Sequence, residues 1–283
     1  MAVFLNLMLK MHWSRRRLFY FIKKLIMRRC LVLSLFIFLC SFSIIAAQDK
    51  WNISKGTHFI VYFKNAPESF IQKVIDNAEN YYNEIADNLG FRRYNFWLWD
   101  NRARIYIYDD AQDYCANTGQ PSWSGGCANI KDKIIHTFPF AKGFFETVLP
   151  HEMGHIIFRE FVGFDNNAIP LWLDEGAASY QQDLRNSTAD KIVKDAIKKG
   201  EFIGLDSLSN INPHTITDTN KVNLFYAESV SMVDFLIKKF GQDSFIYFCQ
   251  QLRDKKDFSK ALASAYPFKD IQELNESWLH YLK

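Results

Sequence analysis

The sequence has no pair of cysteines spaced as CxxC, no internal repeat and no low-complexity linker. The first absence argues against a zinc site built from cysteines. Without repeats or linkers, the 283 residues can form one large domain or two small ones. Hydrophobic residues make up 48% and charged residues 23% of the chain, which is the composition of a globular protein with a substantial core.

A basic surface is also lacking, although the whole chain has a formal charge of +3. Residues 1–47 hold eight Lys and Arg and no Asp or Glu, which leaves 26 of the 34 basic side chains against 31 acidic ones in the remainder. Residues 48–283 therefore carry a net charge of −5. Nucleic-acid binding needs a basic face, so we expect no nucleic-acid partner.

The N-terminal segment has the layout of a secretory signal peptide. Arg28 and Arg29 precede an apolar run over 31–45, and Ala46 and Ala47 offer a small-residue cleavage site. The run is short for a transmembrane helix, which needs about 20 residues, and an uncleaved N-terminal membrane anchor is the alternative. Because Met27 would suit such a signal as a start, residues 1–26 are either an over-extended start or a long basic region.

Both interpretations of the N-terminus keep its basic side in the cytoplasm. We therefore expect residues 48–283 to be exported to the periplasm, the cell envelope or the extracellular space. Three cysteines remain there: Cys115, Cys127 and Cys249. An oxidising compartment permits a disulfide, and a Cys115–Cys127 bond would close a short loop. Three buried thiols are the alternative.

Strand patterns come first in the exported part and helical patterns follow. Alternating β-branched and aromatic residues predict strands over 57–64 and 102–110 and a hairpin over 124–138. Apolar spacing predicts a helix over 68–91 that ends at Gly90, and a short helix over 109–119 that begins at an acidic N-cap. Further helical patterns cover 141–161, 170–184, 188–200, 223–241, 243–255 and 271–282.

This order of elements predicts an α+β fold. We expect a small mixed β-sheet with a packed helix, followed by a mainly helical subdomain. The cleft should run between the two, with an edge strand of the sheet along it.

The stretch HEMGH, residues 151–155, carries the clearest chemistry. Residues four apart share one face of a helix, so His151 and His155 can present two imidazoles to one zinc ion. Glu152 is rotated away from that face, close enough to meet a metal-bound water. A chance HExxH usually lacks a third ligand, but Glu175 follows His155 by twenty residues. Three protein ligands leave the fourth position open for water, as in catalytic zinc sites.

The motif HExxH, nineteen intervening residues and Glu175 within WLDEG resemble the gluzincin pattern of thermolysin-like zinc metallopeptidases. The bacterial peptidase MA-like family is the nearest resemblance, over most of residues 57–283. It implies a zincin core in which His151, His155 and Glu175 hold Zn2+. It also implies that Glu152 takes a proton from the attacking water and passes it to the leaving amine.

The resemblance also implies a donor to the oxygen of the cleaved carbonyl. The stretch FYAESVSMVDFL is similar to the tyrosine-bearing helix of the aminopeptidase branch, which makes Tyr226 the candidate. A core tyrosine with a satisfied hydroxyl is the alternative reading of Tyr226. His214, in the polar loop INPHTITD, is the rival candidate.

Two positions depart from the family patterns. Aminopeptidases of this clan carry Gly-x-Met-Glu-Asn, whose Glu binds the substrate amine, and here the matching position is Ala128. Thermolysin-like enzymes carry an Asp four residues after the Glu ligand, and here it is Ser179, whose hydroxyl accepts a hydrogen bond from a histidine less strongly. The first departure favours an endopeptidase.

We therefore predict an exported zinc endopeptidase, a monomer acting on peptide or protein substrates. The alternative, from another class, is a catalytically silent zincin-fold module that binds partners or assists cell-envelope assembly. The intact Glu152 argues against that module, because a silent site needs no base.

Overall fold

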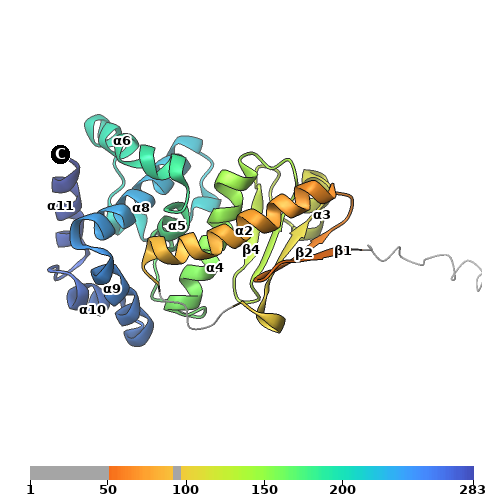
Figure 1. Ribbon diagram of the computed structural model, residues 1–283. Coiled ribbons are helices and arrows are strands. Elements are labelled where there is room, and N and C mark those ends of the chain that lie inside the picture. Colours follow the sequence, from red (N-terminus) through yellow and green to blue (C-terminus); the bar gives the residue numbers. More distant parts are fainter. Residues whose placement is uncertain (1–50, 92–96) are drawn as a thin grey trace, which may run out of the picture. The chain divides into compact units, whose positions relative to one another are not determined.

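The computed structural model describes residues 51–91 and 97–283 (Figure 1). The predicted signal or anchor over 1–47, and the boundary at residue 48, lie outside the described residues. From Trp51 onward the described chain forms one compact unit. Within it, no helix combines the length and apolar character that crossing a membrane requires.

The described residues form a five-stranded mixed sheet with the order β1-β2-β3-β5-β4. Strands β2, β3 and β5 run parallel, while β1 and β4 pair antiparallel with β2 and β5 at the two edges. The strands are β1 (Asn52–Lys55), β2 (Phe59–Phe63), β3 (Ala103–Ile107), β4 (Gly126–Asn129) and β5 (Ile134–Thr137). This confirms the predicted strands and the hairpin, and adds β1, which was not predicted.

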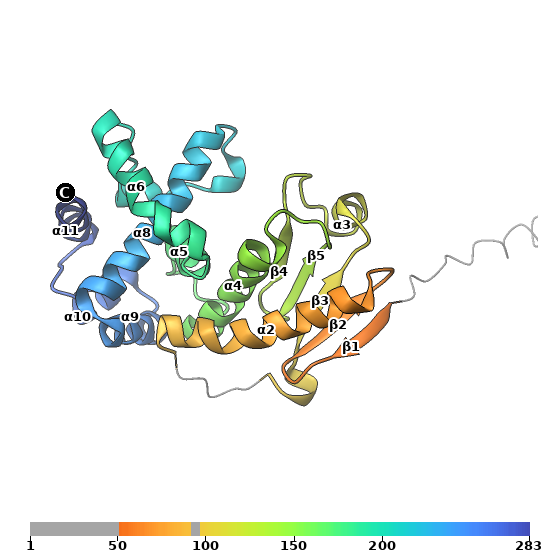
Figure 2. The same cartoon turned by 45° about the horizontal axis from the view of Figure 1, so that its top comes forward.

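Helix α2 (Glu68–Leu89) packs against the sheet (Figure 2). Its buried residues recur at helical spacing, as predicted, and meet the strand side chains that point to the same face. Gly90 ends the helix in the left-handed conformation, with φ of 74°. Helix α3 (Ala111–Thr118) begins at Asp110, whose side chain accepts a hydrogen bond from the backbone N–H of Asp113.

Helices dominate the rest of the chain, so the predicted α+β class is confirmed. They are α4 (Leu149–Val162), α5 (Leu171–Ser179), α6 (Asp183–Lys199), α7 (Leu205–Leu208), α8 (Thr219–Phe240), α9 (Gln242–Lys255), α10 (Phe258–Ala265) and α11 (Ile271–Leu282). Short helical turns cover Trp99–Asn101 and Pro213–Thr215, and a π-helical segment covers Phe144–Val148.

Three helix boundaries differ from prediction. The pattern over 141–161 divides into the π-helical segment and α4, which begins at Leu149. Pro150 therefore lies in the first turn of α4, where a missing N–H costs nothing. The chain breaks after Ser179, and α6 begins at Asp183 rather than at 188. Helix α10 was not predicted.

Two glycines let three helices approach closely. A Cβ on Gly154 of α4 would lie 2.9 Å from the Cα of Ala178 on α5. A Cβ on Gly176 of α5 would lie 2.4 Å from the carbonyl oxygen of Ser229 on α8. Helix α5 is thus held against α4 on one side and α8 on the other. Gly154 thus permits the contact between α4 and α5, and Gly176 permits the contact between α5 and α8.

Of the two alternatives for the cysteines, the Cys115–Cys127 disulfide is not formed, since both thiols are free, and Cys249 is free as well. Cys127 on β4 has the hydroxyl of Tyr114 as its hydrogen-bond partner, and burial raises the pKa of its thiol. Cys115 and Cys127 are half-buried and Cys249 is buried, so the alternative of three buried thiols holds fully for Cys249 alone among the described cysteines.

A buried carboxyl group joins α8 to the segment before α7. Glu228 is fully buried, and its two oxygens accept hydrogen bonds from the backbone N–H groups of Ile203 and Gly204, at 2.9 and 3.2 Å. Burial raises the pKa of Glu228 to about 7, although these two hydrogen bonds act in the opposite direction.

The raised pKa of Glu228 predicts a pH-dependent stability. The folded protein favours the protonated carboxyl group of Glu228. Its contribution to the free energy of unfolding is therefore fully present below pH 4.5, the ordinary pKa, and is lost as the pH rises to the folded-state pKa of about 7. The loss is on the order of 3 kcal/mol. We expect Glu228→Gln to remove this part of the pH dependence, as measured by urea unfolding at pH 5 and pH 8. An identical pH dependence in variant and wild type would contradict the assignment.

Candidate metal centre

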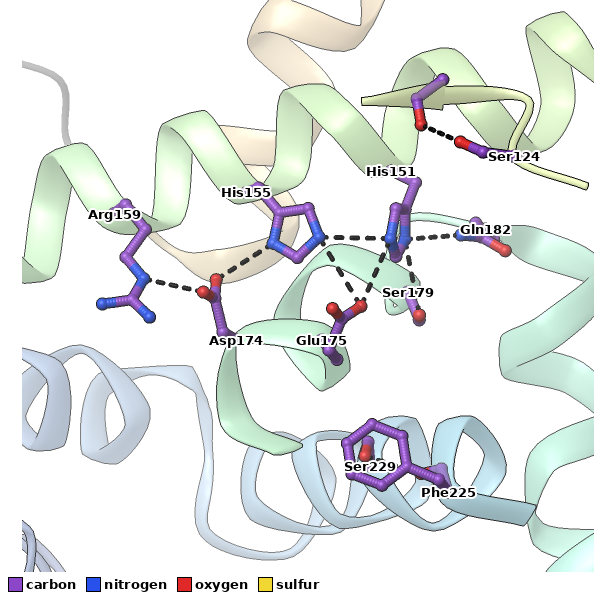
Figure 3. Close-up of polar contacts among 11 residues, drawn as sticks. Ser124, His151, His155, Arg159, Asp174, Glu175, Ser179, Gln182, Phe225 and Ser229 are labelled. Carbon is purple, nitrogen blue, oxygen red and sulfur yellow. Dashed lines mark hydrogen bonds and ion pairs between the residues drawn. The ribbon is translucent and has the colours of Figure 1, made fainter. Parts of the chain in front are cut away.

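Helix α4 places His151 and His155 on one face, one turn apart (Figure 3). The residues around them on α4 are mostly apolar and buried, so the helix lies inside the protein with its imidazoles facing α5. The two Nε2 atoms lie 3.2 Å apart. Both rings therefore direct the same nitrogen at one point.

Glu175 of α5 directs a carboxylate oxygen at that same point. Its Oε2 lies 3.4 Å from Nε2 of His151 and 3.6 Å from Nε2 of His155. Bonds of 2.0–2.1 Å at a tetrahedral angle would place ligand atoms about 3.3–3.4 Å apart. The three observed separations, between 3.2 and 3.6 Å, bracket that value.

The donor set fits a zinc ion. Glu175 Oε2 is buried and accepts no hydrogen bond, although two imidazole nitrogens face it. A pair of facing Nε2 atoms can share one proton at most, whereas one cation would satisfy both nitrogens and the oxygen. Two imidazoles and one carboxylate are ligands that zinc takes in catalytic sites. Among the described residues, His151, His155 and Glu175 form a group able to hold a metal ion.

The charges of the site suit a cation. Burial alone would raise the pKa of Glu175, but the imidazoles of His155 and His151 hold it well below its ordinary value. Burial likewise opposes ionisation of Asp174, and His155 and Arg159 lower its pKa. Burial disfavours a charged His155, yet Asp174 and Glu175 raise the pKa of its imidazole. Both carboxyl groups are therefore anions within a buried site.

A chain of polar contacts fixes the orientation of His155. Its Nδ1 lies 3.1 Å from Oδ1 of Asp174, whose Oδ2 accepts a hydrogen bond of 2.7 Å from Nε of Arg159. Arg159 in turn donates to the carbonyl oxygen of Asn166 at 3.1 Å. A carboxylate at Nδ1 keeps the proton there and leaves the Nε2 lone pair free for a metal. Asp174 was not predicted, although its place next to Glu175 was a signal.

His151 is oriented by a different kind of group. Gln182, between α5 and α6, places its amide nitrogen 2.8 Å from Nδ1 of His151, whereas the hydroxyl of Ser179 lies 3.5 Å from it. Gln182, and not the predicted Ser179, is thus the nearer partner. The amide oxygen of Gln182 is buried without a hydrogen bond. Rotating the amide by half a turn would direct that oxygen at an Nδ1–H of His151.

The three donors open into a cavity of about 570 Å3. Its lining includes residues 124–128 at the edge strand β4, the start of α4, helix α5, and Val222, Asn223 and Tyr226 of α8, together with Thr147 and Gln182. This is the predicted cleft between the sheet and the helices. Ala128 lies in this lining, so no carboxylate stands where the aminopeptidase pattern has one.

The structure brings two further predicted residues into the cavity. Glu152 is buried and lines it beside β4, where a Cβ on Gly126 would lie 3.5 Å from the Cγ of Glu152. The ring of Tyr226 has its centroid 6.4 Å from that of His151. The rival candidate, the side chain of His214, lies outside what the structure describes.

A comparison with known protein families agrees with this site. The family model described as the peptidase MA superfamily matches residues 99–283. A structure of yeast LTA4 hydrolase in complex with bestatin is similar, with a TM-score of 0.43 and 13% sequence identity. The similarity covers 82% of this chain and 36% of that one, so the chain spans about a third of the length of its neighbour. No curated protein matches the sequence.

Removing the carboxylate should remove the metal. We expect the purified protein to contain one zinc per chain, and Glu175→Ala to contain none, because two imidazoles alone bind zinc weakly. Elemental mass spectrometry measures both, with Glu84→Ala on the exposed side of α2 as the control. Zinc retained at full stoichiometry in Glu175→Ala would contradict the ligand assignment.

Removing the amide that orients His151 should weaken zinc binding without abolishing it. We expect Gln182→Leu to bind zinc about 10- to 100-fold more weakly, as measured by competition with a chelator. Gln182→Glu should retain the affinity, because its carboxylate also accepts from Nδ1–H. The surface variant Gln72→Leu serves as the control. Unchanged affinity in Gln182→Leu would show that the contact does not support the metal site.

Proposed function

Since the chain belongs to the peptidase MA superfamily, we propose that it is a zinc-dependent peptidase that hydrolyses peptide bonds. The observation that carries this proposal is the convergence of His151, His155 and Glu175 within 3.2–3.6 Å of one another. This convergence occurs in the same cavity as Glu152. The family implies zinc, and the donor set fits it.

The residues divide the reaction between them. His151, His155 and Glu175 would hold the zinc, which when bound lowers the pKa of water towards about 7 and polarises the scissile carbonyl. Glu152 accepts a proton from the attacking water while the water oxygen bonds to the carbonyl carbon. The same carboxyl group then gives that proton to the leaving amine as the C–N bond breaks. Tyr226, from α8, donates a hydrogen bond to the carbonyl oxygen as charge develops there.

An endopeptidase is the finer part of the proposal. The edge strand β4 lies along the cavity, and an extended peptide can add to such an edge. At Ala128 the cavity has no carboxylate for a free substrate amine. Both features support cleavage within a chain rather than at its N-terminus.

Export of the enzyme, and its action as a monomer on peptides or proteins, complete the proposal. The basic and apolar pattern of residues 1–47 supports export. The alternative is a catalytically silent module that binds partners or assists assembly. An absence of cleavage in the following experiment would favour it.

Changing the proposed base should separate chemistry from metal binding. We expect Glu152→Gln to lower the rate of cleavage of a labelled, denatured protein by about 100- to 10,000-fold, because an amide cannot accept the proton. Its zinc content should equal that of wild type, and Glu84→Gln should be fully active. A zinc-loaded, folded wild type that cleaves no unfolded protein would favour the silent module.

A further inference from the structure

The metal cavity does not end at Tyr226. We propose that it continues into a groove between α6 and α8 that binds an extended, unfolded polypeptide over about five residues on one side of the cleaved bond. The proposal rests on the peptidase function above and defines its substrate class.

Shared lining residues show the continuity. A second cavity of about 270 Å3 shares Thr147, Gln182 and Asn223 with the metal cavity. A third, of about 570 Å3, shares Ile192 and Asn223 with the second. Asn223 of α8 thus lines all of them in turn. The three cavities therefore follow one another from the metal donors outward, with lining residues in common.

One stripe of α6 forms a wall of this groove. The residues are Thr188, Ala189, Ile192, Asp195, Ala196 and Lys199, which recur at the three- and four-residue spacing of a single helix face. The stripe covers eleven helical steps, or about 16 Å at 1.5 Å each. An extended chain advances about 3.3 Å per residue, so about five substrate residues fit along it.

Helix α8 forms the facing wall. Tyr226 and Ala227 follow Asn223 by three and four residues, about one helical turn, so the face around Asn223 borders both the metal cavity and the second cavity. Helices α6 and α8 pack side by side in both views (Figures 1 and 2). At the end nearest the metal donors, Asn223 of α8 is joined in the lining by Thr147 of the π-helical segment and by Gln182 between α5 and α6.

The chemistry of the lining changes along the groove. Next to the metal cavity it is small and apolar, with Ala189 and Ala227 buried and the side chain of Ile192 38% exposed. A single exposed isoleucine is ordinary on a surface, but Ile192 borders both cavities. It therefore offers an apolar contact to one substrate side chain. Farther out the lining carries acidic and basic groups together, which gives no preference for the sign of the substrate charge.

Asn223 suits recognition of a main chain. Its amide offers a donor and an acceptor, and the backbone of an extended peptide offers both in return. Main-chain contacts with one apolar subsite select for an accessible, extended segment and tolerate many sequences. This is the requirement for a substrate that is an unfolded protein.

Cleavage-site mapping tests the groove. The full chain, its Ile192→Asp variant and a matched control, Ile53→Asp on the exposed edge strand β1, would each digest a mixture of denatured proteins. Mass spectrometry would then identify the cut sites. We expect wild type and Ile53→Asp to prefer an apolar residue at one position within about five residues of the cut. In Ile192→Asp, the ratio of cleavage at apolar residues to cleavage at other residues in that position should fall about tenfold, which is the effect of losing one apolar contact.

A second measurement keeps the groove separate from the chemistry. Fluorescence anisotropy with Glu152→Gln would compare a labelled ten-residue peptide that contains the preferred site with one truncated on the preferred side. We expect truncation and Ile192→Asp each to weaken binding about tenfold. Wild-type cleavage with no preference, and binding unaffected by either change, would overturn the groove and leave the peptidase standing. Binding without any cleavage would support the groove and refute the peptidase.

Discussion

Two imidazole nitrogens and a carboxylate oxygen can be held 3.2–3.6 Å apart only if the helices that carry them nearly touch. This constraint explains why α4 and α5 meet at Gly154, where a side chain would collide with the backbone of Ala178. It also explains why α5 needs a support behind it. Gly176 supplies one by letting the backbone of α8 approach, so the position of Glu175 is fixed from both sides. The same contact places Tyr226 of α8 beside the metal donors.

The charge balance of the site follows from the same packing. Asp174 is neutralised by Arg159, to which it is joined at 2.7 Å, so its negative charge does not add to that of Glu175. With neutral imidazoles, the three donors then carry one net negative charge, that of Glu175. The second histidine is oriented by the neutral amide of Gln182 and adds no further charge. The imidazole of His155 is thus oriented by the carboxylate of Asp174, and that of His151 by the neutral amide of Gln182.

The parts of this structure that were predictable are those encoded by short-range spacing. The helix that carries HEMGH, the position of Glu175, the strand patterns and the Gly90 cap each depend on residues within one element or on a fixed gap between two. Gln182 could not be found in this way, because its place depends on the break after Ser179 and on where α6 begins. The contact of Gly176 with α8 could not be predicted, because sequence does not reveal which helix lies behind α5. Strand β1 was missed because its four residues, NISK, are mostly exposed and polar.

Gln182 connects the metal site to the walls of the cleft. It lines both the metal cavity and the cavity beside α6, and it stands directly before the first residue of that helix. The packing of α6 against α8 therefore positions the side chain that orients His151. The edge strand β4 lines the metal cavity from the side of the sheet. A polypeptide bound in the proposed groove along α6 would contact the helix that directly follows Gln182, so this side chain would connect the proposed groove with the imidazole of His151.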